Sequence, residues 1–142
     1  MSEAVNPQKD LRARMRPETL RLKSISPGIT VNDLEASLKW YCGVVGFHVA
    51  EKFENEGVVR GAALIAGVTQ FMISQDGGAK GQDRAKGQAI RLYLTTSQDV
   101  DAVAEAIKTR GGTLASEPAD MPWGARAFNL VDPDGFQLTI TS

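Results

Sequence analysis

The sequence predicts an α+β fold in which two paired βαβββ modules form a curved mixed sheet around a cavity. The first observation is a hairpin signal, because two apolar-alternating runs, 125–131 and 136–141, flank the turn Asp132-Pro133-Asp134-Gly135. The second is an internal repeat, in which each half of the chain presents a strand, an amphipathic helix and further strands. The third is that four strands independently show one apolar and one polar face.

Composition indicates a globular protein. Of the 142 residues, 42% are hydrophobic and 23% are charged, and the formal net charge is −1. This balance predicts no nucleic-acid partner and no membrane surface. Cys42 is the single cysteine, which excludes an internal disulfide and favours a cytoplasmic location. We expect no membrane span and no signal peptide, because no apolar run is long enough for either.

The chain divides into an arm and a domain. Residues 1–23 are polar and basic, and they are expected to form an N-terminal arm that is loose, packs on a partner subunit or binds an anion. Residues 24–142 are expected to form the domain, with modules over 24–75 and 89–142. The linker 76–88 is glycine-rich and charged, and it has no GxGxxG or Walker pattern that would favour a phosphate site.

The first module is predicted to begin with a strand over 24–31, made irregular by Pro27, which cannot donate a ladder hydrogen bond. Asn32 or Asp33 then caps a helix that ends at Gly46. The apolar stripe of this helix consists of Leu34, Leu38, Tyr41, Cys42 and Val45. Three more strands are expected over 47–53, 58–66 and 68–74.

The second module repeats the pattern. It is predicted to contain a strand over 89–96, a helix over 99–110 that stops at Gly111-Gly112, and a short strand over 113–116. The hairpin completes it. Strand alternation then places a set of polar and aromatic side chains on the face turned away from the helices. With the aromatic of the Trp-Gly pair before the hairpin, the predicted ligand-binding residues are Gln70, Met72, Arg91, Tyr93, Trp123 and Gln137.

Three segments, Thr30–Phe47, Lys86–Asp101 and Pro122–Thr141, resemble the vicinal oxygen chelate superfamily, which includes glyoxalase I, extradiol dioxygenases and bleomycin-resistance proteins. The Trp-Gly pair followed by Asp-Pro-Asp-Gly is most similar to the bleomycin-resistance-like branch. The resemblance implies paired βαβββ modules, often in a homodimer, with a cavity built from both modules.

The resemblance also implies four inward positions at which the superfamily's enzymes hold a divalent metal. Carried over to this chain, these positions are Ser26, Met72, Ala89 and Thr139. None is histidine or glutamate, whereas zinc, manganese and iron sites need imidazole or carboxylate ligands. We therefore predict no metal and no cofactor.

Three of the predicted ligand-binding residues have two interpretations each. Arg91 is either an anchor for a ligand carboxylate, phosphate or enolate, or a partner of Glu51 or Glu54 in an ion pair. Tyr93 either donates a hydrogen bond to a ligand or acts as a general acid, or else its ring packs in the core with the hydroxyl in contact with water. Trp123 is either a stacking wall at the cavity mouth or a plug over the core.

Three functions follow from these residues. The first is a metal-independent protein that binds a small molecule, with antibiotic sequestration as one such role. The second is a glyoxalase-like isomerase or lyase with an atypical or absent metal site. The third is a dimerising module with a collapsed cavity. We assign no catalytic residue, because the single histidine, His48, has no evident serine partner. The expected partners are a small-molecule ligand and a second copy of the chain.

Overall fold

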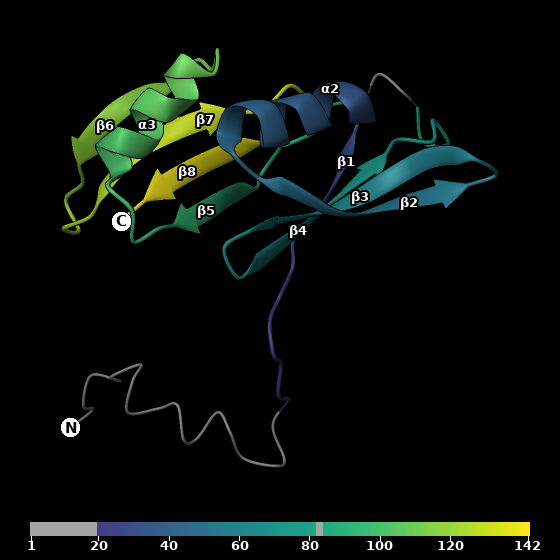
Figure 1. Ribbon diagram of the computed structural model, residues 1–142, viewed down its shortest axis with the longest axis horizontal. Helices are drawn as coiled ribbons and strands as arrows, with labels where there is room; N and C mark the ends of the chain where they lie inside the picture. The colour runs from purple at the N-terminus through teal and green to yellow at the C-terminus, as the bar shows by residue number, and fades with distance from the viewer. Residues whose placement is uncertain (1–19, 82–83) are drawn as a thin grey trace.

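Two four-stranded mixed sheets lie side by side, and helices cover both on the same side (Figure 1). This computed structural model describes residues 20–81 and 84–142, so most of the predicted arm lies outside the described residues. The predicted class of two βαβββ modules is confirmed, and the two sheets are not closed into a barrel. Within the described ranges, no helix is long and apolar enough to cross a membrane.

The first sheet has the strand order β1-β4-β3-β2. Its strands are β1 (Gly28–Val31), β2 (His48–Asn55), β3 (Val58–Ala66) and β4 (Thr69–Gln75), and β1 runs parallel to β4. The prediction that the first strand begins at Ser24 is wrong. Pro27 contributes its carbonyl, which accepts a hydrogen bond from the Met72 amide at 2.9 Å, but the chain before it leaves the sheet and Ile25 is 84% exposed.

The first helix begins and ends as predicted but changes its geometry midway. It starts as α2 (Leu34–Leu38), capped by the Asp33 carboxylate, which accepts a hydrogen bond from the Ala36 amide at 3.2 Å. It continues as the π-helix η1 (Lys39–Val45) and stops at Gly46, whose φ of 118° suits glycine. The π-helical stretch was not predicted, because the apolar stripe alone does not distinguish the two helix types.

The second sheet has the order β5-β8-β7-β6. Its elements are β5 (Arg91–Thr95), α3 (Val100–Thr109), β6 (Ser116–Asp120), β7 (Arg126–Val131) and β8 (Gln137–Thr141). The predicted strand over 113–116 is wrong, because the strand lies further along the chain and includes Pro118. Proline is tolerated there because β6 is an edge strand with an irregular register between Ser116 and Ala119.

One hydrophobic core joins the two modules. On the first sheet, Tyr41 packs against Phe71 and Phe47, with ring centroids 5.1 and 5.9 Å apart. Tyr41 is fully buried, and its hydroxyl donates a 2.7 Å hydrogen bond to Asp132 in the turn between β7 and β8. An aromatic cluster of the first module is thereby bonded to the hairpin turn of the second.

The hairpin turn is held by its two aspartates. One oxygen of Asp132 accepts from the amides of Asp134 and Phe136 at 2.9 and 2.8 Å, while the other accepts from Tyr41. Asp134 accepts from the Asn32 amide at 3.1 Å and from the Ser37 hydroxyl at 3.4 Å, at the start of the first helix. The turn that the sequence identifies as a local hairpin signal therefore also forms the junction between the modules.

We predict that Tyr41→Phe lowers the free energy of unfolding by about 1–3 kcal/mol, because the buried Asp132 loses a hydrogen-bond donor. Urea denaturation measures the loss. Tyr93→Phe is the matched control, since Tyr93 is 67% exposed, and its loss should stay below about 0.5 kcal/mol. Equal losses in the two variants would show that the contact does not stabilise the fold.

Candidate ligand-binding site

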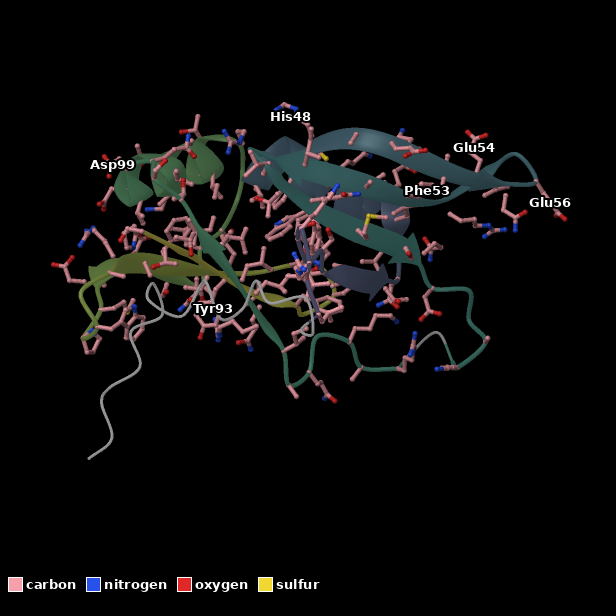
Figure 2. All side chains as sticks on the ribbon, turned by 90° about the horizontal axis from the view of Figure 1, so that it is seen from below. His48, Phe53, Glu54, Glu56, Tyr93 and Asp99 are labelled. Atoms are coloured by element: carbon pink, nitrogen blue, oxygen red, sulfur yellow. The ribbon has the colours of Figure 1, made fainter. Side chains whose placement is uncertain are left out.

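The face of the second sheet that no helix covers carries two rows of functional side chains. Strand register places Arg91, Gln137 and Val131 in one row. The next row contains Tyr93, Thr139 and Asn129. Tyr93 is labelled on this sheet in Figure 2, which views the molecule from below. The predicted residues Arg91, Tyr93 and Gln137 therefore share one face, as strand alternation indicated.

Arg91 is bound by neutral acceptors on this face. Its Nη1 donates to the Thr139 hydroxyl at 3.0 Å and to the Asn129 side-chain oxygen at 3.3 Å. Its Nη2 donates to the side-chain oxygen of Gln137. The Thr139 hydroxyl in turn donates to Asn129 at 2.6 Å. The guanidinium is thus held against the sheet by residues from two strands.

Among the described residues, no carboxylate forms a salt bridge with Arg91. The predicted alternative, an ion pair with Glu51 or Glu54, is not formed. Both glutamates lie on β2 in the first sheet, and Figure 2 shows Glu54 on that sheet and Tyr93 on the other. The arginine charge is therefore not balanced by a carboxylate within this part of the chain.

An open depression of about 590 Å³ adjoins Arg91. Its walls are the end of the linker, the start of β5 and the hairpin turn. The lining residues are Lys86, Gly87, Gln88, Ala89, Ile90, Arg91, Gly135 and Gln137. The sequence did not indicate this depression, because its walls come from segments almost fifty residues apart in the chain.

A buried ion pair holds the linker wall in place. The Lys86 ammonium lies 2.9 Å from the Asp76 carboxylate, and both side chains are about 5% exposed or less. Asp76 also accepts from the Gly78 amide at 2.8 Å and from Arg84 at 3.3 Å, while Lys86 also donates to Asn32. The hydrogen bond from Lys86 is the main cause that lowers the pKa of Asp76 well below its usual range.

Gly87 allows the linker to pass directly beneath the hairpin turn. A Cβ atom at Gly87 would lie 2.6 Å from backbone atoms of Gly135 and Phe136, which is too close for any other residue. Its φ of +74° also favours glycine. The linker and the turn therefore form one continuous wall of the depression.

The remaining predicted site residues lie elsewhere. Gln70 and Met72 are on β4, on the corresponding uncovered face of the first sheet, where the Gln70 amide lies 3.4 Å from the Met72 sulfur. Trp123 is 69% exposed in the turn between β6 and β7, whereas Arg91 lies at the opposite end of the sheet. Within one chain, these three residues are not assembled with Arg91.

The four positions implied for a metal do not fit one. Ser26 and Ala89 both precede their strands and are exposed, and Ala89 has no donor atom. The Thr139 hydroxyl is already engaged with Arg91 and Asn129. Across residues 20–81 and 84–142, no three His, Cys, Asp or Glu side chains cluster closely enough to hold a metal ion. This donor chemistry does not match a zinc, manganese or iron site.

Sequence reasoning missed two parts of the site. Asn129 is a polar residue between the buried Phe128 and Leu130, so the same strand alternation would have placed it beside Arg91. The Asp76–Lys86 pair had no comparable signal, because the residues lie in a linker without periodicity. Asp76 and Lys86 are buried by tertiary contacts, which the sequence pattern does not indicate.

Comparisons with known protein sequences agree with the fold. A family model described as the Glyoxalase/Bleomycin resistance protein/Dioxygenase superfamily matches residues 21–140. A probable lactoylglutathione lyase from Synechocystis sp. is 25% identical over 119 residues, which are 79% of this chain and 88% of that protein.

Solved structures of other proteins share the same architecture. TioX from Micromonospora sp. is similar with a TM-score of 0.68 at 23% identity, over 82% of this chain and 95% of TioX. A member of the same superfamily from Sphaerobacter thermophilus has a TM-score of 0.69 at 26% identity, over 85% of this chain and 97% of that one.

We predict that Gly87→Ala lowers the free energy of unfolding by about 2–4 kcal/mol, from backbone strain and overpacking together. Gly57→Ala is the matched control, because Gly57 has a nearly equal φ of +77° and no atom lies within 4 Å of the place that its added methyl group would occupy. Its loss should be about 1 kcal/mol. Urea denaturation measures both, and indistinguishable losses would contradict the close contact between linker and turn.

Proposed function

Because this chain belongs to the glyoxalase/bleomycin resistance protein/dioxygenase superfamily, we propose that it is a metal-independent protein that binds a small molecule. The observation that carries the proposal is the uncovered face of the second sheet, which combines an exposed aromatic side chain, Tyr93, with the depression beside Arg91. A ligand with an apolar body and a polar group would contact Tyr93 with the first and Arg91 with the second. Gln70, Met72 and Trp123 belong to the proposed site together with Arg91, Tyr93 and Gln137.

Antibiotic sequestration is the role that we propose within this class. The sequence resemblance to the bleomycin-resistance-like branch supports it by analogy. Metal independence is supported by the donor atoms at the four implied positions. A cytoplasmic location and the absence of a nucleic-acid partner remain predictions from the composition.

We further propose that two copies of the chain build the complete cavity. Each sheet has an uncovered face with exposed apolar side chains: Phe53 and Ile65 on the first, Tyr93 and Val131 on the second. Figure 2 labels Phe53 and Tyr93 on these two different sheets. Apposition of the first sheet of one copy with the second sheet of another would bury these residues and bring Gln70 and Met72 towards Arg91.

A lyase or isomerase is the second candidate. The similarity to the probable lactoylglutathione lyase of Synechocystis sp. favours it. Since the implied metal positions do not fit a metal, the acid and electrophile of such a reaction would be Tyr93 and Arg91. Incubation with lactoylglutathione distinguishes the candidates, because a binding protein leaves that compound unchanged.

We predict that a screen of bleomycin and small amphipathic aromatic compounds finds saturable binding by ¹H–¹⁵N NMR. The shifted amides should lie on β5 and β8, and Tyr93→Ala should weaken binding about tenfold, as expected for an aromatic contact. Val68→Ala should have no effect, because Val68 is fully exposed in the turn between β3 and β4. Binding confined to the helix-covered side, or no binding at all, would refute the proposed function.

We predict that light scattering gives a mass twice that of one chain. Ile65→Lys should produce monomers, because it places a charge on the uncovered sheet face within the proposed contact, whereas Val68→Lys, in the fully exposed turn, should leave the dimer intact. If the unsubstituted protein is monomeric at low and at high concentration alike, the two-copy cavity is wrong.

A further inference from the structure

We propose that Arg91 holds the oxyanion of the ligand, so that the ligand is a carboxylate or phosphate ester carried on an apolar or aromatic body. This inference rests on the proposed function and names its ligand class. It follows from how the guanidinium is held, which of its donors are used, and where it lies.

The guanidinium is positioned before any ligand arrives. Thr139, Asn129 and Gln137 come from β8 and β7, and together they accept three hydrogen bonds from Arg91. Three bonds from a rigid planar group restrict its rotation, so little conformational entropy remains to be lost on binding. The acceptors are all neutral, which leaves the full positive charge available.

At least two N–H groups of Arg91 have no acceptor among the described residues. Arginine has five N–H groups, whereas Thr139 and Asn129 accept from Nη1 and Gln137 accepts from Nη2. The N–H group on Nε is among those that remain. A pair of N–H groups on one guanidinium matches the two oxygens of a carboxylate or phosphate.

The neighbouring lysine does not compete with Arg91 for the oxyanion. Lys86 also lines the depression, but its ammonium is buried against Asp76 and Asn32. Arg91 is therefore the cation that the depression offers to a ligand. Ile90, which is 47% exposed, and Tyr93 lie next to it and provide apolar surface for the body of the ligand.

The test uses three probes of similar shape: benzoate, phenyl phosphate and benzamide. The full chain is titrated with each probe at low and at physiological salt, and amide shifts are followed by ¹H–¹⁵N NMR. We expect the two anions to bind at β5 and β8 at least about tenfold more tightly than benzamide, as expected for charge-assisted hydrogen bonds. The preference between benzoate and phenyl phosphate distinguishes a carboxylate ligand from a phosphate ester.

Three variants separate the role of the charge from that of its geometry. Arg91→Met should remove the preference for anions, and Arg91→Lys should restore only part of it, because an ammonium lacks the planar fork. Arg60→Met is the control, since it removes the same charge from an exposed position on β3. Amide dispersion and melting temperature establish that each variant is folded.

The outcomes separate the two hypotheses. Equal binding of benzamide and benzoate, unchanged in Arg91→Met, would overturn the oxyanion site and leave a small-molecule site that is neutral. An anion preference that Arg60→Met abolishes as fully as Arg91→Met would also overturn it, because the effect would then be one of net charge. If none of the three probes is bound, the oxyanion site is refuted, while the wider compound screen decides the proposed function.

Discussion

A buried carboxylate, Asp132, is the constraint on which the rest of the structure depends. An ionised carboxylate out of water is costly unless donors surround it, and Asp132 has two backbone donors from its own turn and a third from Tyr41 in the other module. Burial raises the pKa of Tyr41, so its phenol keeps the proton that it donates to Asp132 at neutral pH. Burial also raises the pKa of Asp132. The two modules must keep their relative position for this bond to form.

The same turn determines the shape of the depression beside Arg91. Gly87 of the linker packs against the backbone of Gly135, and the Asp76–Lys86 pair keeps the linker from lifting away. β5 starts soon afterwards with Arg91. Direct contacts therefore connect the buried Asp132 to the depression through the hairpin turn and the linker. A change in the hairpin turn would also move one wall of the depression.

The chemistry of the site differs from that implied for metal-dependent members of the superfamily. Thr139, one of the four implied metal positions, uses its hydroxyl to bond Arg91 and Asn129. A fixed cationic side chain therefore lies on the sheet face at this position. Such a group can hold an anion by charge and direction.

Local patterns in the sequence determined the order of the strands and helices and which side of most strands faces the core. Alternation placed Arg91, Tyr93 and Gln137 together, and Asp33 and Gly46 bounded the first helix, because these effects act over a few residues. Only the tertiary structure decided the location of Pro118 in an edge strand, the burial of Asp76 with Lys86 and the separation of Trp123 from Arg91. Each depends on which distant segments pack together, and no local periodicity encodes that choice.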